Sequence, residues 1–175
     1  MANREALRAL QTRLANRLQA AKNEEISVSS WLAVESGGQF YLLPLGQAGE
    51  IFHWTVPQPV PYTRPWFLGV ANLRGNLFSM VDLASFLGGQ PLRSEQALAA
   101  SSLLVFNAAL EVNAALLVDR LLGLRGLDAF VSAEAPADDA APFLGSTYLD
   151  AQGTRWQELN LQQLSQYPGF LSISA

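Results

Sequence analysis

The sequence predicts an all-β fold made of two copies of one small β unit, preceded by a helix. Most apolar residues fall in short runs, which is typical of strands. The 13 glycines and 9 prolines are scattered between these runs, where turns are expected. The second half of the chain also repeats, weakly, the order of motifs in the first half.

Residues 1–25 are predicted to form an amphipathic helical extension. Over residues 2–22, apolar side chains recur at three- and four-residue spacing, which indicates a helix with one apolar stripe. The stripe consists of Leu7, Leu10, Leu14, Leu18 and Ala21. Asn3 is placed to cap the first turn. Because a lone stripe needs a surface to cover, we expect it to pack on the protein's own body or on a partner helix.

From Ile26 onward the pattern changes to short strands and turns. The first turn is expected at Gly37-Gly38, and Pro44 implies a sheet edge or a bulge. Residues 57–65 contain four prolines and are expected to form an extended crossing loop. The strands expected before this loop are 28–34, 40–45 and 51–54.

The stretch 65–83 holds two apolar runs around a short polar turn. Asn72 and Gly75 occupy the first and fourth positions of an expected type I turn. Asn is favoured at the first position because its side chain hydrogen-bonds the backbone of the turn, and Gly is favoured at the last position because it tolerates the backbone conformation there. Arg74 would then sit near the tip of a hairpin with its guanidinium outward. The second run alternates loosely and predicts a strand with one face in a core. One side carries Leu77, Val81 and Leu83, and the other carries Asn76, Phe78, Met80 and Asp82.

The region after this hairpin begins with a short helix. Asp82 is placed to cap it over residues 83–87, and Gly88-Gly89 ends it, before a connector at 90–100. The remaining expected elements are strands 103–106 and 112–118, a loop over 132–142, a hairpin of 143–148 and 154–161, and a short helix or turn at 162–166 that ends at Pro168-Gly169.

Two pairs of motifs carry the internal repeat. Residues 65–69 (Pro-Trp-Phe-Leu-Gly) are echoed by 141–145 (Ala-Pro-Phe-Leu-Gly), and 81–83 (Val-Asp-Leu) by 159–161 (Leu-Asn-Leu). The offset rises from 145 − 69 = 76 to 161 − 83 = 78, as a loop insertion would cause. Chance similarity among short apolar strands is the alternative explanation.

The repeat divides the body, residues 26–170, into two expected subdomains, at about 26–92 and 100–170. Neither copy, at about 70 residues, would bury much core alone. We therefore expect the two copies to pack together. The groove between them would be a natural binding surface.

Composition excludes several classes of protein. Half of the 175 residues are apolar and 15% are charged, which is typical of a folded chain. The absence of Cys excludes disulfides and thiolate metal sites. No apolar run reaches the ~18 residues of a membrane span, and the N-terminus is polar, so we expect a cytoplasmic protein without membrane insertion.

Charge is distributed unevenly. Residues 1–22 hold five basic residues and one acidic residue, a balance of 5 − 1 = +4, and the remainder has 6 − 14 = −8. The acidic body is expected to repel nucleic acid. The basic segment is either a solvated helix face or a contact for an acidic lipid surface or an acidic partner.

No catalytic or metal-binding constellation is found in the sequence. The lone His53 lies beside Trp54 in an expected strand and is typical of a packed or surface ring. No phosphate-binding loop or dinucleotide fingerprint occurs. Asp82 and Asp119 each follow a Val, and we expect turn or cap roles for them rather than a catalytic pair. The sequence therefore indicates no enzyme, cofactor or metal.

Residues 69–75 (Gly-Val-Ala-Asn-Leu-Arg-Gly), with the strand ending at 81–83, resemble the signature of the CheW family of chemotaxis adaptors. The resemblance extends over residues 28 to about 166. The further matching elements are Tyr41-x-Leu43-Pro44-Leu45 with Glu50-Ile51, then Leu117-Val118-Asp119, and last Gly145 through Leu161.

The resemblance implies two small five-stranded SH3-like barrels packed side by side, without enzymatic activity. It implies two partners, the regulatory domain of a CheA-type histidine kinase and the cytoplasmic tip of a methyl-accepting chemoreceptor, and a monomer when the protein is alone. The family's partner-binding positions map onto Ala48, Glu50, Gly69, Arg74 and Gly75. Arg74 on a turn suits a partner carboxylate, and glycines permit close approach, although turn geometry explains them equally well.

Two positions depart from the family pattern. Ser79 stands where Pro is usual, which puts a proline-made bulge in doubt, and Ala48 is smaller than the usual residue. The basic N-terminal helix and Trp-rich middle resemble the type IV pilus, or twitching-motility, branch of the family. The alternatives are an ordinary flagellar adaptor, or a β-barrel protein that binds a small ligand in the groove.

Overall fold

The computed structural model describes residues 9–18 and 30–175. Residues 9–18 are helical, within the predicted helix 2–22, while the rest of that helix and its Asn3 cap lie outside the described residues. Within the described ranges, no helix is long and apolar enough to cross a membrane.

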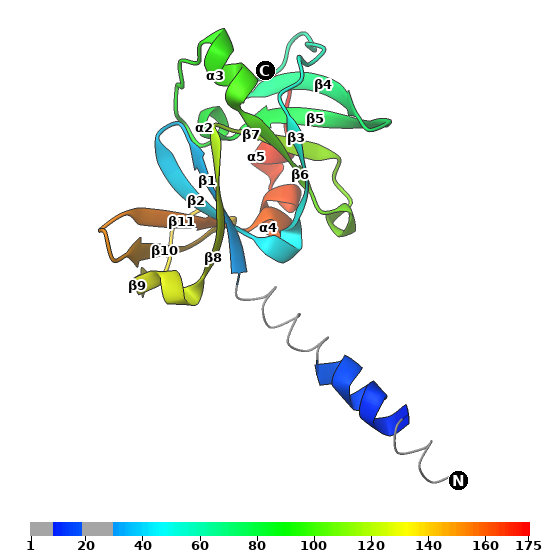
Figure 1. Cartoon of the computed structure of the whole chain (residues 1–175). Coiled ribbons are helices and arrows are strands. Elements are labelled where there is room, and N and C mark those ends of the chain that lie inside the picture. The colour runs from blue at the N-terminus through cyan, green and yellow to red at the C-terminus, as the bar shows by residue number, and fades with distance from the viewer. Residues whose placement is uncertain (1–8, 19–29) are drawn as a thin grey trace.

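Two sheets, in which most neighbouring strands are antiparallel, form the body (Figure 1). The six-stranded sheet has the order β8 (Arg120–Gly126), β1 (Ser30–Ser36), β2 (Gln39–Pro44), β11 (Arg155–Leu159), β10 (Leu144–Asp150), β9 (Phe130–Glu134). The five-stranded sheet has the order β3 (Ala48–His53), β6 (Ser102–Phe106), β7 (Ala114–Val118), β5 (Asn76–Asp82), β4 (Phe67–Leu73). The predicted all-β fold is confirmed.

Short helices and 3₁₀ turns connect the strands. The α-helices are α2 (Leu83–Phe86), α3 (Glu95–Ala100), α4 (Leu161–Gln166) and α5 (Pro168–Leu171). The 3₁₀ turns are η1 (Leu45–Gln47), η2 (Ala108–Leu110) and η3 (Leu127–Ala129). As predicted, Asp82 caps α2, and its carboxylate accepts a hydrogen bond from the Ser85 N–H at 3.4 Å. Asn160, its counterpart in the repeat, caps α4 in the same way.

The two copies of the repeat exchange their first hairpins. Hairpin β1–β2, from the first half, joins β8–β11, and hairpin β6–β7, from the second half, joins β3–β5. Each exchanged hairpin pairs in parallel with a strand from the other half of the chain, β2 with β11 and β7 with β5. The order of equivalent strands is the same in both sheets, apart from the additional β9. Each sheet therefore contains strands from both sequence ranges, 26–92 and 100–170.

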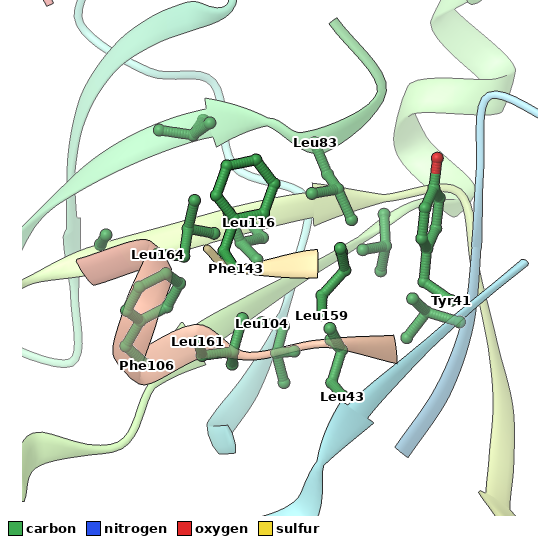
Figure 2. Packing of buried hydrophobic residues seen from close by; sticks show 14 of the residues in the cluster. Tyr41, Leu43, Leu83, Leu104, Phe106, Leu116, Phe143, Leu159, Leu161 and Leu164 are labelled. Carbon is green, nitrogen blue, oxygen red and sulfur yellow. The ribbon is translucent and has the colours of Figure 1, made fainter. Parts of the chain in front are cut away.

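A shared hydrophobic core joins the two sheets (Figure 2). On β7, Ala114, Leu116 and Val118 pack into this shared core, while Ala115 and Leu117 pack inside the five-stranded barrel. Strand β1 alternates in the same way between the shared core and a smaller cluster in the six-stranded barrel. The exchanged hairpins are thus buried on both faces. This explains why the sequences of their strands are nearly continuous apolar runs and not alternating ones.

Three local predictions were wrong. Leu77 is exposed while Met80 is fully buried, because β5 protrudes at its turn and is covered on both faces at its inner end. Strand β9 overlaps the start of the predicted loop 132–142. It lies at the edge of its sheet and has no buried residue, so its sequence does not show the alternation of apolar and polar residues that indicates a strand. The expected connector 90–100 contains α3. The predicted helix at 162–166 ends before Pro168-Gly169, as expected, but Pro168 also starts α5, as proline's fixed φ allows.

A buried ionic cluster lies where the two sheets meet. Arg93 Nη1 lies 2.6 Å from Asp82 Oδ2, and Arg93 Nε donates to Asp119, which also accepts the Gly37 N–H at 2.6 Å. The side chains of Arg93 and Asp82 are each 8% exposed. Burial alone lowers the pKa of Arg93, but its hydrogen bonds to the two carboxylates outweigh burial and raise it. Arg93 therefore joins the ends of β5 and β7 to the β1–β2 turn.

Replacing Arg93 with alanine is expected to lower the free energy of unfolding by about 3–5 kcal/mol, since it leaves a buried carboxylate without its cation. Urea denaturation measures this loss. The matched control is Arg155→Ala, which removes an exposed ion pair with Glu134 and is expected to cost at most about 1 kcal/mol. Similar losses in both variants would contradict a structural role for the cluster.

Gly69 holds the proline-rich crossing loop against β4. The Gln58 and Val70 backbones exchange two hydrogen bonds, of 2.7 and 3.0 Å. Gly69 has φ +131°, and a Cβ at this position would lie 2.2 Å from the Gln58 carbonyl oxygen. Only glycine fits without moving the loop.

We expect Gly69→Ala to lower the free energy of unfolding by about 3 kcal/mol, because it combines backbone strain with overpacking. Gly75→Ala is the control, since Gly75 has φ +84° but open space around it, and its cost is expected at about 1–2 kcal/mol. Urea denaturation of both variants checks the difference; a loss at Gly69 no larger than that at Gly75 would contradict the steric argument.

Candidate functional site

The β4–β5 hairpin ends in a two-residue turn. Leu73 pairs with Asn76, and both residues between them have positive φ, 51° at Arg74 and 84° at Gly75. This is the type I′ pattern, whose twist matches that of the flanking strands. The predicted type I turn at 72–75 was therefore wrong by one residue. Asn72 still stabilises the turn, because its Oδ1 accepts the Gly75 N–H at 2.9 Å.

Arg74 reaches from this turn to strand β3. Its Nη2 lies 2.5 Å from Glu50 Oε1, and its guanidinium lies 5.8 Å from the centre of the Phe52 ring. Strands β3 and β4 are the two edges of the five-stranded sheet, so these contacts bring its two edges together. The barrel closes at the hairpin tip.

The Arg74–Glu50 pair is accessible from solvent. The Arg74 side chain is 73% exposed and that of Glu50 is 44% exposed. An exposed ion pair contributes at most about 1 kcal/mol to stability, so it can be rearranged at little cost. A guanidinium has five N–H donors, which leaves Arg74 able to bind a second carboxylate.

The five predicted residues divide into two groups. Glu50, Arg74 and Gly75 lie together at the hairpin tip. Ala48 packs against the shared core and pairs with Phe106, and Gly69 accommodates the crossing loop. The structure thus gives Ala48 and Gly69 contacts within the protein, while the tip residues face outward.

Sequence reasoning missed three apolar residues on the strands that carry the tip. Phe52 supports Arg74 from β3, and Ile51 and Leu77 are exposed on β3 and β5. Apolar side chains around a charged group are a common composition for a protein-binding surface. The signal for Leu77 was its position two residues after Gly75, close to the turn, but the alternation of the strand assigned it to the core.

Other candidate groups have structural roles. Asp82 and Asp119 act in a cap and a turn, as predicted, and both contact Arg93. His53 is exposed on β3. In residues 9–18 and 30–175, no group of three or more acidic or His side chains is placed to hold a metal ion.

Comparison with known proteins identifies the family. The model of the CheW-like domain matches residues 30–168, which include both sheets. The chain is 34% identical over 160 residues to "Protein PilI" of Pseudomonas aeruginosa, covering 88% of this chain and 85% of that protein. It is 35% identical over 60 residues to "Probable chemotaxis protein CheW" of Rhizobium etli, covering 34% of this chain and 39% of that protein.

A solved structure shows the same fold. The crystal structure of the scaffolding protein TtCheW from Thermoanaerobacter tengcongensis superposes with a TM-score of 0.62 and 16% identity, covering 75% of this chain and 88% of that one. The fold, the family model and the similarity to PilI agree across both barrels. The chain belongs to the CheW-like family.

Proposed function

We propose that this protein is a non-enzymatic cytoplasmic scaffold that links a methyl-accepting chemoreceptor to a CheA-type histidine kinase. The observation that carries the proposal is the family match across both barrels. The kinase's regulatory domain and the receptor's cytoplasmic tip are the proposed partners.

We place the kinase contact at the hairpin tip formed by Glu50, Arg74 and Gly75. Arg74 is exposed, charged and held over Phe52, so its guanidinium is preorganised for a partner carboxylate. Ile51 and Leu77 would supply apolar contact around it. Ala48 and Gly69 would support this surface by fixing β3 and β4.

The pathway we propose is the control of type IV pilus twitching motility. The similarity to PilI extends over most of both chains, whereas that to the Rhizobium CheW covers about a third. An ordinary flagellar adaptor is the alternative within the family.

A small-ligand-binding barrel is less well supported. The interiors of both barrels are filled by side chains, among them Leu42, Met80, Leu103 and Leu117, each at most 1% exposed. A hollow of about 430 Å³ lies beside the six-stranded sheet, but it is open and lined by mixed side chains. Ligand sites are usually concave and mostly apolar, with a few convergent polar groups.

Calorimetric titration of the kinase regulatory domain from the same organism tests the proposed contact. Wild type is expected to bind with micromolar affinity or tighter, and Arg74→Ala to bind about tenfold more weakly, because a charged hydrogen bond is lost. Arg155→Ala, which removes an exposed paired arginine on the other sheet, is the matched control and is expected to bind normally.

Glu50→Gln separates the two roles open to Arg74. If Arg74 binds the partner directly, this variant keeps or gains affinity, since an internal competitor is removed. An equal loss in Glu50→Gln and Arg74→Ala would instead mean that the pair only braces the barrel. No binding by folded wild type would refute the coupling role for that kinase.

Deletion of the gene is expected to abolish twitching and to leave swimming unchanged where the organism has both. Zone assays on agar measure the two motilities, and complementation with the wild-type gene is the control. Loss of swimming with normal twitching would assign the protein to the flagellar pathway.

A further inference from the structure

The helix at residues 9–18 carries an apolar surface that the rest of the described chain leaves uncovered. Leu10, Leu14 and Leu18 are 61%, 53% and 66% exposed. All other residues of this helical segment are exposed as well. Of the stripe predicted from the sequence, the part formed by Leu10, Leu14 and Leu18 is therefore not covered by any other residue that the structure describes.

The shape of this stripe is informative. At about 100° per residue, each four-residue step turns the stripe by about 40°, so the three leucines cover a sector of about 80°. Arg17 and Arg13 fall about 20° and 60° beyond Leu10, along one edge of the sector. The sector thus has a basic border along one edge.

The charge around the stripe points to an anionic occupant. Glu5 is the one acidic residue among residues 1–22, against five basic residues, while the rest of the chain has a balance of −8. The basic charge is thus concentrated where the uncovered leucines are.

Two protein occupants fit this pattern poorly. A heptad coiled-coil seam alternates steps of three and four residues, so a seam with Leu10 and Leu14 one four-residue step apart would meet Arg17 at its next three-residue step. A second copy packed antiparallel would bring the Arg13 and Arg17 borders of both copies to the same side, and like charges repel. A planar anionic surface accepts both the leucine sector and the arginines.

We propose that this helix binds peripherally to an anionic lipid surface. The three leucines would enter the boundary between headgroups and acyl chains, and Arg13 and Arg17 would extend to headgroup phosphates. The helix would lie in the plane of the surface and would not span the bilayer. This property goes beyond the adaptor function and does not depend on it.

Cosedimentation of the full-length protein with vesicles tests the proposal. Partition into phosphatidylcholine vesicles containing phosphatidylglycerol is expected to exceed partition into pure phosphatidylcholine by about tenfold or more, and to fall at high salt. The triple variant Leu10→Gln, Leu14→Gln, Leu18→Gln and the double variant Arg13→Gln, Arg17→Gln should each weaken partition about tenfold. Glutamine is a good helix former, so the helix is retained.

The matched controls lie on the body. Leu92→Gln changes a fully exposed leucine, and Arg155→Gln an exposed arginine; both should partition like wild type. No partition of wild type into the anionic vesicles would overturn the proposal, as would full retention by the leucine variant. Equal partition with and without phosphatidylglycerol would refute the role of the arginines. Kinase-domain binding, measured on the same helix variants, is expected to be unchanged and keeps this test separate from the adaptor proposal.

Discussion

Completion of each sheet by a hairpin from the other half of the chain is the constraint on which this structure depends. Strands β1 and β2 lie between β8 and β11, and β6 and β7 lie between β3 and β5. An exchanged hairpin has one face in a barrel and the other in the shared core, so its side chains are buried on both sides. The two barrels are therefore one cooperative body.

The same arrangement positions the hairpin tip. Strand β5 is fixed at its inner end by pairing with β7 and by the contact between Asp82 and Arg93. Its outer end can then project Arg74 toward Glu50 on the opposite edge of the sheet. A rigid base and an exposed tip are what a binding scaffold needs, because a contact that is already ordered costs less entropy on association.

Much of this could be predicted from residues alone, but not the exchange. Caps and turns are local, so Asp82 and the Gly37-Gly38 turn were found correctly. The repeat was visible in residues 81–83 and 159–161, yet which hairpin completes which sheet depends on contacts between distant segments. At the tip, Arg74 was found by its turn, whereas its contacts with Glu50 and Phe52 depend on barrel closure and carry no local signal.

The exchanged hairpins also bear on how the chain folds during synthesis. The Trp31 indole donates to Glu158 at 2.6 Å, although the two residues are 127 positions apart. The β1–β2 hairpin therefore leaves the ribosome long before the strands that flank it exist, with two apolar faces exposed. Contacts so distant in sequence form slowly, and unpaired apolar strands are prone to aggregate. Chaperones that cover exposed apolar strands would therefore protect this hairpin until nearly the whole chain has been synthesised.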